Sequence, residues 1–223
     1  MKNTGFLVLV VMLLSVSALA VDGVVLINQS GVMAAGGFPY KITQPGSYKL
    51  SGNLTMNTSV SGNFNGIDVA IAVASSNISL DLNGFTITVN DLIGQSLSHP
   101  FYGIAEAARL SQISITNGSV RVTSVYNRVA LTAINFQSSF VLKFTELNLV
   151  NTQPILDVAP PMANLLLAGG DSLVQHVVTD GAILLRCPST AIDNIGFVSA
   201  DANGNLASCT IVNNSRSLFV DVQ

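Results

Sequence analysis

The sequence predicts an all-β protein built as a solenoid, and three observations lead to this prediction. Only 9% of the 223 residues are charged and 49% are hydrophobic, whereas soluble domains are on average about 25% charged. The polar positions hold mainly Ser, Asn and Thr, a mixture that together with β-branched residues is typical of an all-β solenoid or sandwich. Segments that alternate apolar and small polar residues also recur along the chain, which favours the solenoid.

Residues 1–20 have the layout of a secretory signal peptide. Lys2 precedes an apolar run from Phe6 to Leu14, and Ala18-Leu19-Ala20 forms an A-x-A cleavage signal. The alternative is a membrane anchor, but the run is shorter than the roughly 20 residues that span a bilayer. We therefore expect cleavage near Ala20 and a secreted protein without a membrane span, in the periplasm, at the cell surface or outside the cell.

Residues 21–38 are expected to cover the N-terminal end of the solenoid, because an open solenoid end must be shielded. The candidate cap is Val24 to Ala35, and the solenoid domain is assigned to residues 39–223. No comparable polar segment follows Phe219. We therefore expect that the last coil is exposed or covered by a partner, or that the chain continues beyond it.

The clearest repeat runs from Ile78 to Asn90. Its apolar residues at alternate positions are predicted to point inward, and the pair Asn83-Gly84 interrupts the alternation with a turn that tolerates positive φ. A second copy has Asn117-Gly118 at the equivalent place. More degenerate copies cover 133–149, 181–195 and 206–215.

The two Asn-Gly pairs distinguish a solenoid from a flat sheet. They lie 34 residues apart, since 117 minus 83 is 34, and removal of the intervening loop leaves a coil of about 20 to 25 residues. In a flat hairpin sheet each pair reverses the chain, whereas in a solenoid each pair is a corner between two strands of one coil. The short connections between strands favour the corner.

Three segments carry motifs of a known kind of protein. They are Ile42 to Thr55 (ITQPGSYKLSGNLT), Ile78 to Gly84 (ISLDLNG) and Ser208 to Asn214 (SCTIVNN). Together they resemble exported bacterial right-handed parallel β-helix proteins of the pectate-lyase-like superfamily. The resemblance implies a right-handed parallel β-helix of about seven coils, on the order of 34 Å long. It implies no particular activity, because these motifs are core and turn positions.

Cys187 and Cys209 are expected to form a disulfide, because one pair of thiols in an exported protein lacks the ligands for a zinc site. In a β-helix they lie one coil apart, and stacked coils bring Cα atoms within the roughly 4.4–6.8 Å that a disulfide allows. Closing a loop of this length stabilises the protein by about 3 kcal/mol in the chain-entropy model.

Motifs for nucleophilic catalysis are weak. Gly170-Asp171-Ser172-Leu173 spells the signature of GDSL hydrolases, but no histidine follows His176, and a serine without a base is inert. We interpret this segment as a tight polar turn. His99 is placed in a loop, and His176 is interpreted as a packed residue because apolar residues surround it.

A lyase site would need more carboxylates than the chain offers in one place. Enzymes of the pectate-lyase-like superfamily hold Ca²⁺ with clustered carboxylates and use an Arg or Lys base. Ca²⁺ requires several oxygen ligands. The closest approach here is Asp193 and Asp201, with Arg186 as the basic neighbour. Each of the three also suits a solvated surface position or a turn. We therefore expect no metal and no cofactor, with Ca²⁺ needed only for the lyase alternative.

Three functions remain after these exclusions. Nine Lys and Arg against twelve Asp and Glu provide no basic surface for nucleic acid. The favoured function is an exported, non-catalytic β-helix with polysaccharide as its candidate partner. The alternative is a small polysaccharide lyase or hydrolase acting on uronate-type glycans. A second alternative is a structural module that associates through its open C-terminal coil, and the sequence leaves the oligomeric state open.

Overall fold

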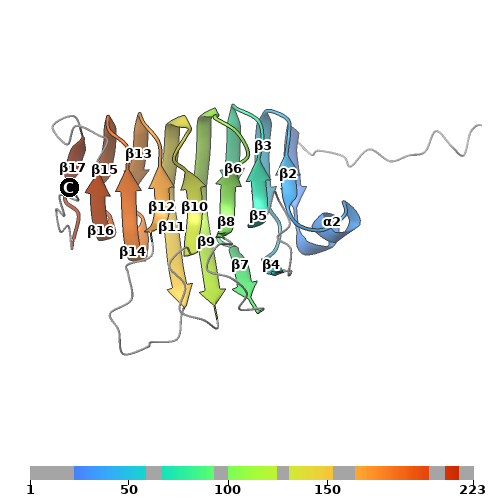
Figure 1. Ribbon diagram of the computed structural model, residues 1–223. Coiled ribbons are helices and arrows are strands. Elements are labelled where there is room, and N and C mark those ends of the chain that lie inside the picture. The colour runs from blue at the N-terminus through green and yellow to red at the C-terminus, as the bar shows by residue number, and fades with distance from the viewer. Residues whose placement is uncertain are drawn as a thin grey trace, which may run out of the picture.

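The chain folds as a parallel β-solenoid, so the all-β prediction is confirmed. The structure is a computed structural model that describes residues 23–58, 67–92, 100–124, 131–152, 164–200 and 209–215. Its strands lie side by side along one axis, from β2 at one end to β17 at the other (Figure 1). The expected signal peptide, residues 1–20, lies outside the described residues.

Each coil contributes to three stacks of parallel strands. The first stack consists of β1 (Val24–Ile27), β3 (Gly46–Leu50), β6 (Ile78–Asp81), the first half of β9 (Ser111–Ser124), the first half of β11 (Phe140–Thr152), β13 (Ser172–Gln175), β15 (Ser189–Ile192) and β17 (Thr210–Val212). Within the described residues this stack contains eight strands, whereas the sequence predicts about seven coils.

The chain passes from the first stack into the second and then the third. The second stack consists of β4 (Leu54–Asn57), β7 (Thr86–Asp91), the second halves of β9 and β11, and the starts of β14 (Val178–Leu185) and β16 (Ile195–Ala200). The third consists of β2 (Tyr40–Ile42), β5 (Asp68–Val73), β8 (Phe101–Glu106), β10 (Leu131–Phe136), β12 (Asn164–Ala168) and the ends of β14 and β16.

The core consists of rows of apolar side chains that run along the solenoid axis. In the first stack one such row is Leu80, Ile115, Phe144, Val174 and Ala191, all fully buried and in register from strand to strand. Burial of whole apolar side chains contributes roughly 1.5–3 kcal/mol each, so these rows supply most of the driving force for stacking. The inward positions predicted from the alternation are therefore confirmed.

Neutral polar rows cover much of the outer face of the early coils, which explains the low charge. Ser47, Ser79 and Ser114 stand in register on the first stack. On the second stack the side-chain amide of Asn90 donates to Oδ1 of Asn57 at 3.1 Å. These positions are filled by uncharged side chains, and the Asn57–Asn90 pair is hydrogen-bonded from one rung to the next without an ion pair.

A short helix lies at the N-terminal end of the solenoid, as Figure 1 shows. This helix, α2 (Gln29–Ala34), is capped by Asn28, whose side chain accepts a hydrogen bond from Gly31 N at 2.8 Å. Val32 is its buried residue. The segment expected to be the cap, residues 21–38, thus also contains β1, which pairs with β3 as a strand of the first stack.

The predicted disulfide is confirmed. Cys187 and Cys209 are bonded, with their Cα atoms 5.2 Å apart. Cys187 precedes β15 and Cys209 precedes β17, and these two strands pair directly. The bond therefore joins two adjacent coils near the C-terminal end. Among the described residues, no helix is long and apolar enough to cross a membrane.

Candidate functional site: the corner groove

Single residues with left-handed backbone turn the chain between the first and second stacks. Asn83 and Asn117, the predicted corner residues, have φ of 53° and 59°. Gly84 also has positive φ. Gly118 is required for space instead, because a Cβ there would lie 2.3 Å from the Cβ of Leu82. Among the described residues, the other left-handed residues of this corner are Glu146, His176, Asp193 and Asn213.

The corner between the third and first stacks carries an open groove of about 470 Å³. We call it the corner groove, and the residues that line it are Arg109, Gln137, Ser138, Ser139, Phe140, Gly170, Asp171 and Arg186. These residues precede or begin β9, β11, β13 and β15, which are successive rungs of the first stack. With rungs about 4.8 Å apart, the groove runs along the axis for about 14 Å.

Arg109 and Phe140 form one wall of the groove. The Arg109 guanidinium carbon lies 5.4 Å from the centre of the Phe140 ring, a cation–π geometry. Both residues are exposed, so the pair faces solvent. A guanidinium stacked on a ring keeps the N–H groups at its edge directed outward, where they can pair with a ligand carboxylate or sulfate.

Glu106 positions the turn that forms the floor. Its Oε1 accepts from Ser138 N at 2.8 Å, and its Oε2 accepts a short hydrogen bond from Ser139 Oγ. Ser139 Oγ in turn accepts from Leu110 N at 2.9 Å, and Ser139 is only 2% exposed. The carboxylate is therefore occupied in holding residues 138–139, and the Ser139 hydroxyl is not presented to a ligand.

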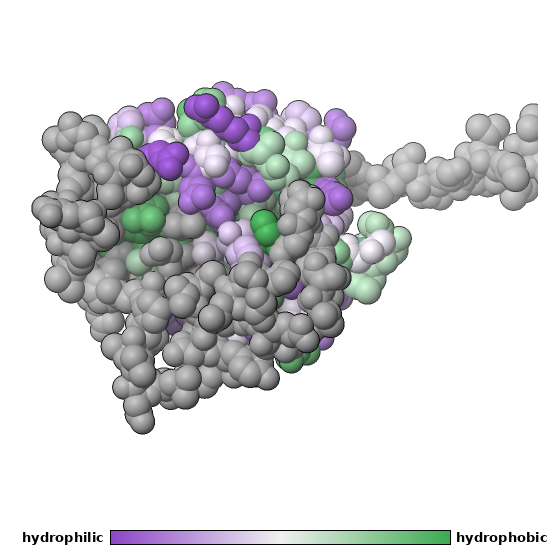
Figure 2. Space-filling view, viewed as in Figure 1, coloured by the Kyte–Doolittle hydropathy of each residue, from purple (hydrophilic) through white to green (hydrophobic). Residues whose placement is uncertain are grey.

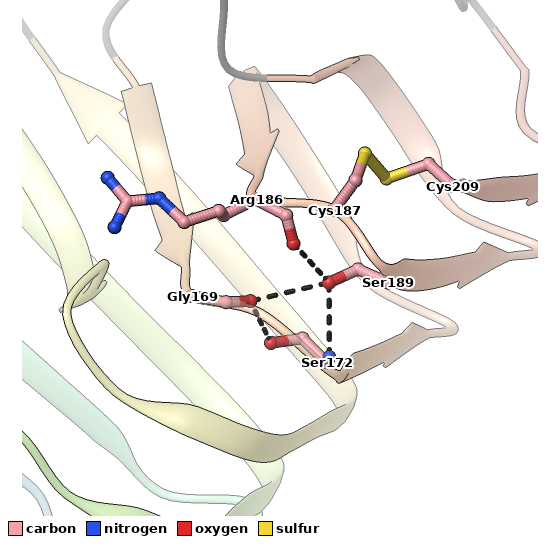
Figure 3. The surroundings of a disulfide bond; sticks show 6 residues. All are labelled: Gly169, Ser172, Arg186, Cys187, Ser189 and Cys209. Carbon is pink, nitrogen blue, oxygen red and sulfur yellow. Dashed lines mark hydrogen bonds between the residues drawn. A yellow bond between two sulfur atoms is a disulfide. The ribbon is translucent and has the colours of Figure 1, made fainter. Parts of the chain in front are cut away.

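A serine network holds the opposite wall, as Figure 3 shows. Ser189 Oγ donates to the carbonyl of Arg186 at 2.6 Å and accepts from Ser172 N at 3.1 Å. Ser172 Oγ donates to the carbonyl of Gly169 at 2.5 Å. The Arg186 side chain extends away from the disulfide that begins at Cys187 (Figure 3). The backbone at Arg186 and Cys187 is thus held by a hydrogen bond and by the disulfide.

The GDSL-like segment forms a polar turn that leads into β13, as the sequence predicts. Ser172 is 3% exposed and its hydroxyl is bound to Gly169 O. His176 lies beyond the far end of β13, four residues on. The interpretation of His176 as a packed residue is wrong, because its side chain is 53% exposed. It occupies a left-handed corner position, which turns the side chain outward although its neighbours are apolar.

The residues named for a lyase site are not brought together where the structure describes them. Arg186 precedes β15 and Asp193 follows it, so they lie at opposite ends of that strand. Asp193 instead faces His176, with Oδ2 3.6 Å from Nε2. Asp201 lies outside the described residues, as does His99. Among the described residues no group of three or more His, Cys, Asp or Glu is placed to hold a metal ion.

A second hollow, of about 420 Å³, lies beside the N-terminal end and is lined by residues 35–41. Burial raises the pKa of Tyr40, which lines it, and the nearby Tyr48 raises that pKa further. Tyr48 donates to the carbonyl of Gln44 at 2.7 Å, and burial raises its pKa too. Both phenols therefore stay neutral under ordinary conditions. The lining comes from one short segment, unlike the corner groove, which several coils build.

Sequence reasoning missed the corner groove because its residues are far apart in the chain. Arg109 and Arg186 come from the β9 and β15 rungs, and no motif connects them. Figure 2 shows hydrophilic side chains gathered along the upper edge of the view, where the third stack turns into the first. Comparisons of the chain with family models, curated proteins and solved structures found no match.

Proposed function

We propose that the protein is an exported, non-catalytic β-helix that binds an acidic glycan in the corner groove. The observation that carries the proposal is the placement of Arg109, Phe140 and Arg186 in one open, elongated groove. Guanidinium groups pair with carboxylate and sulfate oxygens through two parallel hydrogen bonds. A groove that is open along its length suits a chain of sugars better than a small compact molecule, which needs a deeper and more apolar pocket.

The chemistry of the groove supports binding rather than turnover. Ser139, which lines its floor, is buried and bonded to Glu106. Asp171 is the carboxylate among the lining residues, and a lone carboxylate lacks the oxygen ligands that a Ca²⁺-dependent lyase uses. The separation of Arg186 from Asp193 along β15 counts further against the lyase alternative.

Export is supported by two independent features. The first 20 residues have the layout of a signal peptide. The bond between Cys187 and Cys209 suits an oxidising compartment, because structural disulfides are rare in the reducing cytosol. The motifs that resemble those of the pectate-lyase-like superfamily fit this proposal, since they concern the fold and imply no activity of their own.

The test is calorimetric titration of the processed protein with an all-uronate oligosaccharide and with a neutral cello-oligosaccharide of the same length. We expect the acidic probe alone to bind, with an affinity that falls as salt rises. Arg109→Gln and Arg186→Gln should each weaken binding about 5- to 10-fold, about 1–1.4 kcal/mol. Arg121→Gln, which changes an exposed arginine of β9 outside the groove, is the matched control.

Turnover is measured in the same samples. Incubation with Ca²⁺ and the all-uronate probe should produce no unsaturated product in the ultraviolet. Formation of such product would overturn the non-catalytic part of the proposal. Equal binding of acidic and neutral probes, or binding that is insensitive to both arginine substitutions, would overturn the assignment of an acidic glycan to the groove.

A further inference from the structure

We infer that the ligand extends from the corner groove onto the outer face of the first stack, where an adjoining hollow takes an uncharged sugar. This inference rests on the proposed function and adds the composition of the glycan. The hollow has a volume of about 450 Å³ and we call it the outer-face hollow. Its lining residues are Asp171, Ser172, Leu173, Pro188, Ser189, Thr190 and Thr210. Asp171 also lines the corner groove, so the two hollows adjoin at this residue.

The floor of the outer-face hollow is a row of three side chains on consecutive rungs. Leu173 pairs in register with Thr190, and Thr190 pairs with Thr210. Leu173 and Thr190 are half-buried, and Thr210 is exposed. Each threonine offers a methyl group and a hydroxyl that both donates and accepts. A row of this kind matches the alternation of C–H and hydroxyl groups on a neutral sugar ring.

The charges distinguish the two adjoining hollows, one suited to an acidic sugar and the other to a neutral sugar. The corner groove contains two guanidinium groups, from Arg109 and Arg186. Among the residues that line the outer-face hollow, Asp171 is the charged one. Lys143 continues the row beyond Leu173 but does not line the hollow. A second ligand carboxylate placed there would meet the Asp171 carboxylate at close range and be repelled by it.

The junction between the two hollows is held in place by the backbone. Asp171 has a left-handed φ of 54°, and its N–H donates to the carbonyl of Pro188 at 2.5 Å. Pro188 follows Cys187, which the disulfide ties to the next coil. The carboxylate of Asp171 therefore stands at a defined point between the arginines and the threonine row. The glycan that fits has neutral units adjoining a uronate rather than uronates throughout.

The experiment compares three probes by calorimetry and NMR titration at fixed ionic strength. They are a tetrasaccharide of alternating uronate and neutral N-acetylhexosamine units, an all-uronate tetrasaccharide and a uronate monosaccharide. We expect the alternating probe to bind about fivefold more tightly than the all-uronate probe. Thr190→Ala should weaken the alternating probe about threefold and leave the monosaccharide unchanged. Thr145→Ala, on the same face but outside both hollows, is the matched control.

Asp171→Asn tests the sign of the charge effect, since asparagine keeps the left-handed backbone and removes the charge. It should strengthen the all-uronate probe about three- to fivefold and the alternating probe by a smaller factor, because Asp171 also lines the corner groove that holds the uronate of that probe.

If acidic probes bind through Arg109 and Arg186 but all-uronate and alternating probes bind equally, and Thr190→Ala has no effect, the proposed function stands and this inference is overturned. If no probe binds, both are overturned.

Discussion

At the corners, left-handed backbone restricts which side chains are tolerated without strain. Between the third and first stacks they form a column of Asn77, Gln112, Val141 and Asp171, with φ from 54° to 59°. Asn and Asp adopt this conformation at little cost, whereas a β-branched residue there is an outlier. Val141 is also 47% exposed and adjoins Phe140 of the corner groove. The strain at Val141 therefore lies beside the candidate site.

Val141→Asn is expected to stabilise the protein by about 1 kcal/mol, because it relieves the left-handed strain without removing a buried side chain. Urea denaturation measures the change. Gln112→Asn, at the neighbouring position of the same column, is the control and should gain less, since Gln112 is unbranched. A loss of stability in Val141→Asn would contradict the reading of this position as strained.

Gly118→Ala is expected to destabilise the protein by about 2–3 kcal/mol, because overpacking shifts backbone and side chains. The new Cβ would lie 2.3 Å from the Cβ of Leu82 and 2.8 Å from the carbonyl oxygen of Phe85. Gly52→Ala is the matched control, since nothing lies within 4 Å of its Cβ position. Equal denaturation midpoints for the two variants would show that the corner tolerates a side chain.

At the scale of elements, the last coils are joined by a ladder of two asparagines at the corner between the first and second stacks. Asn194 is 1% exposed, and its Nδ2 donates to Val174 O at 3.0 Å and to Asn214 Oδ1 at 2.8 Å. Its Oδ1 accepts from Val177 N at 2.9 Å. One side chain therefore satisfies a backbone group of β13 and one of the connection that follows it, and it contacts the next coil.

Asn194→Ala should destabilise the protein by about 2–4 kcal/mol, because it leaves the buried Val177 N–H without its acceptor. Asn194→Asp keeps the acceptor but places a buried carboxylate oxygen against Val174 O and Asn214 Oδ1, so a loss at least as large as that of Asn194→Ala is expected. Guanidinium denaturation of both variants and of Asn214→Ala measures the effects. A coupling energy near zero between Asn194→Ala and Asn214→Ala would contradict a ladder that acts as a unit.

At the scale of the whole molecule, stability passes from rung to rung, because each coil of a solenoid contacts mainly its neighbours. The last described strand, β17, pairs with β15 through three residues. The Cys187–Cys209 bond adds a covalent link between the same two coils. It therefore protects the end of the molecule that also holds the outer-face hollow.

Replacement of both cysteines, Cys187→Ser with Cys209→Ser, is expected to cost about 3 kcal/mol for a loop of this length. The loss should be local. Hydrogen exchange should accelerate in β15–β17 and stay unchanged in β5–β8, several rungs away. Uniform acceleration along the chain would instead indicate that the solenoid unfolds as one cooperative unit.

Coil length explains which parts of the fold were open to prediction. Ile78 pairs with Ile113, 35 residues on, whereas Ser172 pairs with Ser189, 17 residues on. The estimate of 20 to 25 residues lies between these two spacings. Because the period drifts, sequence spacing cannot assign a residue to its neighbour two or three rungs away. Alternation within one strand does not depend on the period, and so the inward positions were predictable.

The sequence by itself determined the features that depend on local pattern. Alternation around Leu80 marks the buried face, Asn83 and Asn117 mark corners, and the Cys187–Cys209 separation marks adjacent coils. Only the tertiary structure decided what the corners bring together. Arg109 and Arg186 share a groove because β9 pairs with β11, β11 with β13 and β13 with β15. The register of each pairing decides which residues of successive coils lie side by side. Each pairing is set by how side chains pack between coils of unequal length, and that packing exists only in the folded chain.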